Sequence, residues 1–260
     1  MNIVFQTEQR CSFFSALANV LSLSGNNIAM WDSNQKSVYE MIQEISPDLL
    51  FISNTFPDKY FKEIERLKYI TYDTKDKSDK ALLNISNADN KDDCFADLLS
   101  YKESFINEKF GTDVLISSNF VDRDIIVKIT KLADNIFNNT NFTLKICGMT
   151  AIKCPYFTGI STPQEFTSIA KGSKIVIANN NIEKYSLMYN GVYSCTIDEV
   201  TDEELLMVEK EKLRKQTIKR IKKDIIENKK MSPYIVMKIF KTIGMNEECS
   251  KIEQTLGKIL

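Results

Sequence analysis

Charged and polar side chains that could do chemistry follow each of four short apolar runs near the start of the chain. Glu8 and Arg10 follow the first run, Asp32 the second, Asn54 the third and Asp73 the fourth. A carboxylate acts as a general base when it lies within hydrogen-bond reach of a bound hydroxyl, and the candidates here are Asp73 and Glu8. The alternative for each of these acids is a loop-capping or solvated role.

Histidine is absent from the sequence. Its absence removes Ser-His and Cys-His catalysis and every histidine-ligated metal site. Proton transfer must therefore use Asp, Glu, Lys, Tyr or Cys, or a leaving phosphate. The cysteines form no Cys-x-x-Cys pair, and their scatter favours buried thiols in a reducing cytoplasm over a disulfide framework or a zinc site. They are Cys11, Cys94, Cys147, Cys154, Cys195 and Cys249, and nothing in the sequence requires a metal.

The chain has 260 residues, which is enough for one large domain or two small ones with a buried core. With 34 basic and 35 acidic residues its net charge is −1, so the overall charge points neither to nucleic acid nor to a membrane surface. Its apolar runs are shorter than the roughly 18 residues of a membrane span. The opening Met1–Phe5 has no basic segment before it and predicts a first strand, not a signal peptide. We expect a cytoplasmic protein, in the host cytoplasm if it is viral.

Strands and helices alternate through the first half of the chain. The pattern predicts strands over 2–6, 27–31, 49–53 and 69–72, with helices over 12–24, 37–45 and 58–67 between them. Ser37 and Glu40 have the spacing of a capping box. The polar stretch 73–93 predicts an exposed loop with a short helix. Alternation of this kind is typical of a parallel sheet with helices on both faces.

A second, smaller block of strands and helices follows Gly111. It predicts strands over 113–117, 142–147 and 156–159 and a final strand over 174–178, with helices over 122–135 and from Pro163 onwards. From Asp202 the chain is predicted to be helical, with Leu206, Leu213, Ile221 and Ile225 as one apolar stripe and a last helix over 232–243.

We therefore predict an α/β protein of two Rossmann-like domains that face a cleft, followed by C-terminal helices. The expected boundaries are 1–117, 118–201 and 202–260. The carboxyl ends of the strands would meet at the cleft, where open α/β sheets bind ligands. With eight glycines, the sequence has no Gly-x-Gly-x-x-Gly or Walker-type loop, which argues against a dinucleotide oxidoreductase or a P-loop NTPase.

A series of short motifs runs through the second block in a fixed order. Ser118-Asn119 and then Arg123 follow one strand, Leu144–Gly148 and Tyr156–Gly159 come next, and Lys174–Ala178 precedes Tyr189-Asn190-Gly191. This order resembles the donor-binding half of the GT-B glycosyltransferases, which have two Rossmann-like domains. It is most similar to their spore-protein-like, family 1-like group. The likeness covers about residues 1–200 by element order and 113–195 by motif.

The resemblance implies a nucleotide-sugar donor, with a UDP-sugar expected, held by the second domain, and an acceptor facing the first domain. It places Arg123 near the diphosphate, for which a permanently charged guanidinium is well suited. The alternative for Arg123 is a pair with a carboxylate at the start of the helix. For Gly148 and Gly159 the alternative to close approach to a ligand is a turn that needs a positive φ. The implied donor-binding residues are Ser118, Asn119, Arg123, Gly148, Met149, Gly159, Ile160, Glu183, Tyr189, Asn190 and Gly191.

One position departs from the family pattern. The family carries a ribose-binding glutamate five residues before the glycine that matches Gly191, and this chain has Ser186 there. The nearest acid is Glu183, which either replaces the missing glutamate from one helical turn away or leaves donor binding altered or absent.

The segment from Glu209 to Lys230 is strongly basic. It contains ten basic and four acidic residues, a net charge of +6. The segment is either a solvated helix face or an electrostatic surface for a phosphate backbone or an anionic lipid. The residues expected at such an acceptor surface are Arg10, Arg214, Lys215, Lys219, Arg220, Lys222 and Lys223.

Together these patterns predict a glycosyltransferase that moves a sugar from a nucleotide-sugar to an acceptor hydroxyl. One possible acceptor is a hydroxymethylated base in DNA, as in viral DNA-modifying transferases, which would require the base to be flipped out. The alternative is a non-catalytic GT-B-like module that binds nucleic acid or another anionic partner through the basic helix. A third possibility is a nucleotide-sugar epimerase of the same architecture. The sugar, the stereochemical outcome and the oligomeric state stay open.

Overall fold

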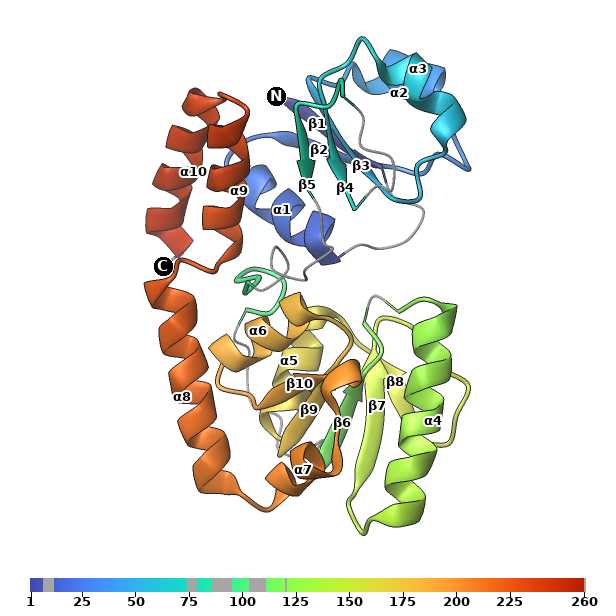
Figure 1. The fold of residues 1–260 in the computed structure, drawn as a ribbon, viewed down its shortest axis with the longest axis vertical. Helices are drawn as coiled ribbons and strands as arrows, with labels where there is room; N and C mark the ends of the chain where they lie inside the picture. The colour runs from blue at the N-terminus through green and yellow to red at the C-terminus, as the bar shows by residue number, and fades with distance from the viewer. Residues whose placement is uncertain (7–11, 74–78, 86–94, 103–110, 120, 260) are drawn as a thin grey trace. The chain divides into compact units, whose positions relative to one another are not determined.

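The chain forms two compact units, each built on its own sheet (Figure 1). The computed structural model describes residues 1–6, 12–73, 79–85, 95–102, 111–119 and 121–259. Unit 1 consists of Met1–Asp93 and Ser232–Leu260, and unit 2 of Cys94–Met231. The last helices therefore return to the unit in which the chain begins.

Unit 1 contains a five-stranded parallel sheet with strand order β2-β1-β3-β4-β5. This is the flavodoxin-like order, in which the switch point lies between the first and third strands. The strands are β1 (Asn2–Gln6), β2 (Asn27–Trp31), β3 (Leu49–Ser53), β4 (Tyr69–Tyr72) and β5 (Leu83–Ile85). The helices are α1 (Ser12–Leu23), α2 (Val38–Ile45), α3 (Phe61–Ile64), α9 (Ser232–Thr242) and α10 (Asn246–Ile259).

Both faces of this sheet are covered, because neighbouring residues of a strand point to opposite sides. Val4 and Leu50 belong to a cluster with side chains of α2 and α3. The adjacent Phe5 and Phe51 stack at 4.6 Å between ring centroids and meet Phe14 of α1. Helices α9 and α10 pack on α1, on the side of the sheet away from α2 and α3 (Figure 1). The continuous apolar strands predicted from the sequence are buried for this reason.

Two predictions in unit 1 need correction. The polar stretch after Asp73 was expected to be a loop with a short helix, but Leu83–Ile85 forms the edge strand β5. The expected helix over 58–67 consists of a 3-10 turn, Asp58–Tyr60, and the single turn α3. The capping box of α2 is confirmed, since the Ser37 side chain accepts from the Glu40 amide and the Glu40 carboxylate accepts from the Ser37 amide.

Unit 2 contains a second five-stranded parallel sheet, with strand order β10-β9-β6-β7-β8. The strands are β6 (Val114–Ser117), β7 (Leu144–Gly148), β8 (Phe157–Ile160), β9 (Ile175–Ala178) and β10 (Ser194–Thr196). Helices α4 (Arg123–Asn139), α5 (Pro163–Lys171), α6 (Asn181–Tyr189), α7 (Asp202–Leu205) and α8 (Glu211–Glu227) surround it. Counted from β6, this is the Rossmann order 3-2-1-4-5. An α/β protein with two parallel sheets is thus confirmed.

The two faces of the second sheet have separate cores. Val114 and Ile116 of β6 pack in one cluster with Ile129 and Ala133 of α4. The intervening Leu115 packs in the other cluster with side chains of α5 and α6. The expected final strand over 174–178 is not the last, because α6 and the short strand β10 follow it.

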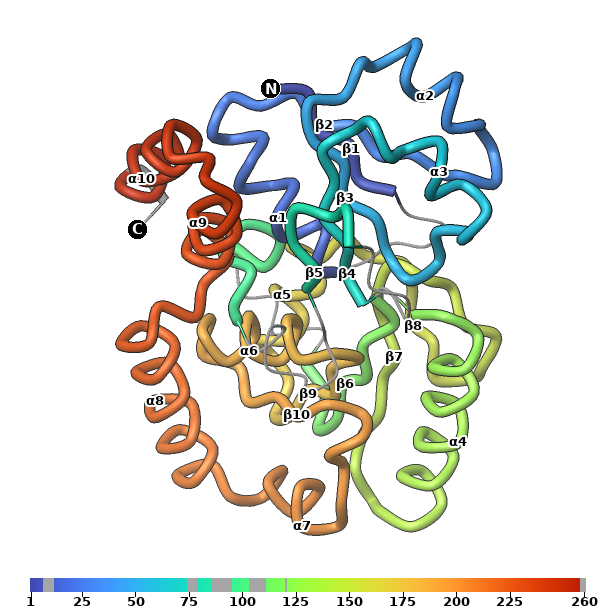
Figure 2. Tube along the Cα trace, turned by 45° about the horizontal axis from the view of Figure 1, so that its top comes forward, coloured from blue at the N-terminus to red at the C-terminus, as the bar shows by residue number. Residues whose placement is uncertain are grey.

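The unit boundaries differ from the expected 1–117, 118–201 and 202–260. β6 pairs with β7 and β9, so its residues belong to the second sheet. Helix α8 packs against α6 of unit 2 (Figure 2), whereas α9 and α10 belong to unit 1. The predicted apolar stripe is also interrupted: Ile225 is buried, but Leu206 and Leu213 are 46% and 45% exposed.

Candidate functional site

The strand order of unit 2 defines a switch point between β6 and β9. From β6 the chain moves outward to β7 and β8, then returns to the opposite side of β6 for β9 and β10. Doubly wound sheets bind ligands outside the carboxyl ends of the strands at such a switch point. The residues there are Ser117, Ser118 and Asn119 after β6, and Asn179 after β9.

A fully buried carboxylate, Glu183 of α6, organises this switch point. Its Oε1 accepts hydrogen bonds from Ser117 Oγ at 2.7 Å, Asn119 Nδ2 at 2.8 Å and Tyr101 OH at 3.2 Å. Its Oε2 accepts from the backbone N–H of Asn179 at 3.0 Å. Four donors compensate the carboxylate for the water that it loses on burial.

The environment shifts the pKa values of this network. Burial raises the pKa of the Glu183 carboxyl above its ordinary value, and the bonds from Asn119, Asn179, Ser117 and Tyr101 oppose that rise. Burial, then the nearby Glu183 charge, raises the pKa of Tyr101 well above its ordinary value, so this phenol is a hydrogen-bond donor to the carboxylate.

Two asparagines connect the loops that follow three strands. Asn119 Oδ1 accepts from the backbone N–H of Met149, after β7, at 2.9 Å. Asn179 Nδ2 donates to the Asn119 carbonyl at 2.7 Å and to Ser117 Oγ at 3.3 Å. The carboxyl ends of β6, β7 and β9 are therefore held together by side-chain amides and by Glu183.

Gly148 is required by the close approach of two of these loops. Its φ is +154°, and a Cβ at this position would lie 2.6 Å from the Ser118 carbonyl carbon and 2.7 Å from the Asn119 nitrogen. Real Cβ atoms do not approach backbone atoms this closely. A glycine is needed at position 148 because the loop after β6 occupies the space that a side chain would fill. Its φ is also positive, which was the alternative reason predicted for this glycine.

Two buried polar atoms at the switch point have no hydrogen-bond partner among the described residues. They are Ser118 Oγ and Asn179 Oδ1. Ser118 is fully buried, whereas Asn179 is half-buried. Buried polar atoms in native proteins are nearly always paired, so each such atom needs an explanation. The protein itself covers both atoms, so a ligand would pair with them only after the loops at the switch point move. A hydroxyl and an amide oxygen can hold neutral hydroxyl or N–H groups, such as those of a nucleoside.

Three of the expected donor-binding residues lie away from this edge. Tyr189, Asn190 and Gly191 form the C-terminal end of α6, which runs back from the carboxyl edge of β9 and leads into β10. At 1.5 Å per residue, α6 separates them from the switch point by about 13 Å. Asn190 Nδ2 donates to the carbonyls of Tyr101 and Ser186, and Gly191 has a φ of +85° after the helix. These residues end a helix, and their expected contact with donor has no support in this geometry.

The expected ribose contact of Glu183 also differs from the geometry. Both carboxylate oxygens are occupied by protein donors and the residue is 0% exposed. Glu183 therefore holds the loops and presents no oxygen to solvent. Gly159 lies in β8 at an irregularity in the β7–β8 pairing, with φ of +149°. The next residue, Ile160, is 70% exposed at the carboxyl end of the edge strand.

Arg123 is the first residue of α4, which begins after the β6 loop. Its side chain is exposed and forms no hydrogen bond or ion pair with any residue that the structure describes. The expected alternative, a pair with a carboxylate at the helix start, is not formed by the described acids. The guanidinium is available to an anion.

The catalytic candidates of unit 1 are only partly described. Glu8 and Arg10 lie outside the described residues. Asp73 directly follows β4 and has a φ of +53°, and its backbone N–H donates to the Ile85 carbonyl at 2.8 Å. Its side chain is half-buried at the carboxyl edge of the first sheet. Its role as a base stays a prediction.

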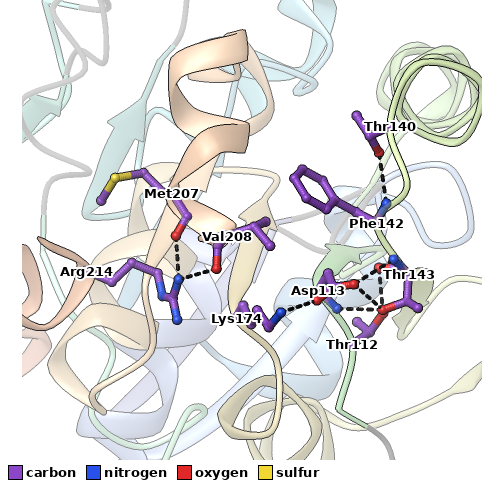
Figure 3. A network of polar contacts seen from close by, with 9 residues as sticks. All are labelled: Thr112, Asp113, Thr140, Phe142, Thr143, Lys174, Met207, Val208 and Arg214. Carbon is purple, nitrogen blue, oxygen red and sulfur yellow. Dashed lines mark hydrogen bonds and ion pairs between the residues drawn. The ribbon is translucent and has the colours of Figure 1, made fainter. Parts of the chain in front are cut away.

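The basic helix is less available to a partner than its charge suggests. Arg214 donates to the carbonyls of Met207 and Val208 (Figure 3). Lys215 pairs with Glu211 and Lys223 with Glu227, and Lys222 lies over the Tyr189 ring at 4.7 Å. The Arg214 guanidinium thus caps the preceding turn, and its expected contact with an acceptor stays a prediction. Lys219 and Arg220 are exposed and form no hydrogen bond or ion pair within the described part of the chain.

Figure 3 also shows an ion pair at the amino-terminal edge of the second sheet, opposite the switch point. Lys174 Nζ is 2.6 Å from Asp113 Oδ1, and Asp113 also accepts from Thr143. Desolvation is the largest single effect and raises the Asp113 pKa, but the bonds from Lys174 and Thr143 together outweigh it and hold that pKa below its ordinary value. This cluster joins the starts of β6, β7 and β9 and takes no part in the switch point.

Sequence reasoning missed Tyr101, Ser117 and Asn179 as site residues. A usable signal existed for two of them, because Ser117 ends one predicted strand and Asn179 directly follows another. Tyr101 carries no such signal, since it lies 82 residues from Glu183 in the chain.

No group of three or more Cys, Asp or Glu side chains that could hold a metal occurs within the described ranges. Among the same residues, no helix is long and apolar enough to cross a membrane.

No protein-family model and no curated protein matches the chain. Among solved structures, one from Listeria monocytogenes provisionally described as a UDP-N-acetylglucosamine 2-epimerase is similar at 8% identity over 97% of this chain and 90% of that one, with a TM-score of 0.44. A LacI family transcriptional regulator from Silicibacter pomeroyi is similar at 10% identity over 72% of each chain, with a TM-score of 0.28. Both likenesses are weak, so the description of the fold rests on the strand order and connections given above.

Proposed function

We propose that the chain is a nucleotide-sugar-dependent glycosyltransferase of the GT-B class, which binds its donor at the β6/β9 switch point of unit 2. One observation carries the proposal: Ser118 Oγ and Asn179 Oδ1 are buried there without partners, beside loops that Glu183 and Gly148 hold in place. A nucleoside offers the hydroxyl and N–H groups that these two atoms would pair with.

The other parts of the donor have candidate contacts on the same unit. Arg123 would pair with the diphosphate, and its permanent charge would stabilise the leaving group. Ile160, exposed at the carboxyl end of β8, offers an apolar surface to the base. A UDP-sugar is the proposed donor, and the proposal requires no metal.

The proposed reaction joins an acceptor hydroxyl oxygen to the anomeric carbon of the sugar. The bond from that carbon to the diphosphate oxygen breaks, and the nucleoside diphosphate leaves with the electron pair. In an inverting enzyme Asp73 or Glu8 of unit 1 would take the hydroxyl proton, whereas a retaining enzyme would need no such base. The arrangement of the two units around a cleft, and a hydroxymethylated DNA base as acceptor, belong to this proposal. Lys219 and Arg220 are the residues of the basic helix best placed to contact a polyanionic acceptor.

The first test is thermal unfolding of the full chain with a panel of nucleotides and nucleotide-sugars. A ligand at a hundred times its Kd adds about 2.7 kcal/mol of stability, which is a visible shift. Ser118→Ala should weaken the bound nucleotide-sugar about tenfold, since one hydrogen bond is lost.

Ser194→Ala is the matched control for this test. Ser194 Oγ is also buried and unpaired in unit 2, but Ser194 begins β10 at the opposite edge of the sheet. Its substitution should leave binding unchanged. Binding that survives Ser118→Ala at full strength, or no binding by any nucleotide-sugar, would contradict the proposed donor site.

A second candidate, a non-catalytic module of the same fold, is favoured by the burial of Glu183. The acid nearest to the family's ribose-binding position has both oxygens engaged inside the protein. Arg123→Ala separates the candidates: in an enzyme it should abolish sugar transfer, whereas in a module that binds through α8 it should leave partner binding intact.

A further inference from the structure

Unit 1 contains an apolar pocket between α9 and the edge strand β5, next to the carboxyl end of β5, where the Ile85 carbonyl accepts from the Asp73 backbone N–H. Its volume is about 140 Å³. Its apolar lining comes from three elements: Phe13 of α1, Leu83 and Ile85 of β5, and Ile235 and Ile239 of α9. We call it the α9–β5 pocket. An apolar cavity of about 150 Å³ can hold a benzene-sized molecule, so this one has room for a short hydrocarbon chain.

One cationic group lies in the wall of this pocket. Lys238 of α9 is exposed, and its ammonium forms no hydrogen bond or ion pair with any residue in the described ranges. The other polar side chains of the wall are already engaged. Thr242 Oγ1 donates to the Lys238 carbonyl at 2.9 Å, and Asn84 Oδ1 accepts from Thr71 Oγ1. Among the residues that the structure describes, the pocket therefore combines five apolar side chains with one unpaired ammonium.

We propose that the α9–β5 pocket binds a medium-chain carboxylate, with the alkyl chain among the five apolar side chains and the carboxylate on Lys238. Each buried methylene contributes about 0.8 kcal/mol, so the chain supplies most of the affinity. The ammonium supplies the preference for a charged head group through a charge-assisted hydrogen bond.

The charge of the pocket selects among possible head groups. A single ammonium balances the single charge of a carboxylate. A phosphate monoester carries nearly two charges at neutral pH and three acceptor oxygens, and it is usually met by several donors. The wall of the α9–β5 pocket offers one. An alkyl alcohol would fill the same apolar space but would gain no charge pair.

The test is calorimetric titration of the full chain with octanoate, octanol and octyl phosphate. Octanoate should bind more tightly than the other two. Lys238→Met keeps the length of the side chain and removes its charge, so it should weaken octanoate about tenfold and leave octanol unchanged. Ile235→Trp, at a half-buried position of the wall, should fill the pocket and weaken octanoate and octanol alike.

Lys241→Met is the matched control. Lys241 is also exposed on α9 but does not line the pocket, so its substitution should leave octanoate binding as it is. Circular dichroism of each variant checks that unit 1 is folded.

Three results would overturn the proposal. They are no binding of octanoate, equal loss of octanoate binding in Lys238→Met and Lys241→Met, and tighter binding of octyl phosphate than of octanoate. A fourth result would overturn it as well: binding to vesicles that contain phosphatidylserine but not to octanoate in solution. The carboxylate would then come from a membrane surface and not from a free fatty acid. Binding of a nucleotide-sugar to unit 2 is measured in a separate experiment. Failure of the pocket proposal would therefore leave the proposed function standing, and the reverse also holds.

Discussion

In unit 1 the switch point between β1 and β3 is held by an uncharged amide, whereas in unit 2 the switch point between β6 and β9 is held by a buried carboxylate. Gln6 Oε1 accepts from the backbone N–H and the hydroxyl of Ser53, at 3.1 and 3.0 Å. Its Nε2 donates to Ser33 and Thr55, each at 3.3 Å. Both residues, Gln6 and Glu183, are fully buried and each has four hydrogen bonds to its side chain.

The difference lies in what each network leaves unpaired. At the β1/β3 switch point the named side chains satisfy one another, since Ser53 Oγ also bonds with Thr55 Oγ1 at 2.8 Å. At the β6/β9 switch point two polar atoms remain without partners. A carboxylate costs more to bury than an amide and is kept only where its donors are well placed. Unpaired buried side-chain atoms therefore occur at the switch point of unit 2 but not among the side chains named at the switch point of unit 1.

The largest expected loss of stability comes from removing the side chains at the centres of the two networks, Glu183 and Gln6. Glu183→Ala leaves four donors without their acceptor and should destabilise unit 2 by about 4 kcal/mol, because hydrogen bonds to charged groups are worth about 1.5–3 kcal/mol each and their losses are not additive. Gln6→Ala breaks neutral bonds and should cost unit 1 about 2 kcal/mol. Urea unfolding followed by circular dichroism measures both. Equal costs would remove the distinction between a charged and a neutral switch point.

The sequence predicted the strands around these networks but not the networks themselves. Val4–Phe5 and Leu49–Ile52 lie in continuous apolar runs, which indicate buried parallel strands without any other information. β5 and β10 were missed because each has three residues, too few for a period to appear. Three of the four donors to the Glu183 carboxylate lie 64, 66 and 82 residues away in the chain, so its burial depends mainly on tertiary contacts that no local pattern contains.

Gly148 is a second example of a residue whose tertiary contacts the sequence does not reveal. Its type and its place after a strand marked it as important, but the expected reason was close approach to a ligand. The structure shows an approach to the backbone of Ser118 and Asn119 instead.

The next largest effect is therefore expected from Gly148→Ala. The added Cβ would lie within 2.8 Å of three backbone atoms, at a φ of +154°. We expect a loss of about 3 kcal/mol in the stability of unit 2, since backbone strain adds to overpacking. Gly159→Ala is the matched control, with a φ of +149° but nothing within 4 Å of its Cβ, and should cost only about 1 kcal/mol. If both variants lose the same stability, backbone conformation alone explains Gly148.

A smaller effect should appear in the pH dependence of stability. Burial raises the pKa of Glu183 above its ordinary 4.5 in the folded chain. Between 4.5 and the raised value the folded state binds more protons than the unfolded state, so the free energy of unfolding falls as pH rises through this window. Asp97 is also buried with a raised pKa and adds a slope of the same sign.

The measurement for this effect is the difference in pH slope between the wild type and Glu183→Gln, recorded by urea unfolding at a series of pH values. The variant should show the shallower fall, because glutamine does not titrate. Gln6 has no proton to exchange, so Gln6→Leu should leave the slope as it is. A slope that Glu183→Gln does not change would assign the pH dependence to Asp97 and its surroundings.

The smallest effect separates a paired hydroxyl from an unpaired one. Ser53→Ala in unit 1 removes a hydroxyl that bonds with Gln6 and Thr55, and should cost about 1 kcal/mol. Ser118→Ala in unit 2 removes a buried hydroxyl that has no partner, so without ligand it should be neutral or stabilising by up to about 1 kcal/mol. With a bound nucleotide-sugar the sign should reverse, since the wild type then gains a hydrogen bond that the variant lacks. Thermal unfolding with and without the ligand measures this reversal, and a Ser118→Ala variant that is destabilised in its absence would mean that the hydroxyl already has a partner inside the protein.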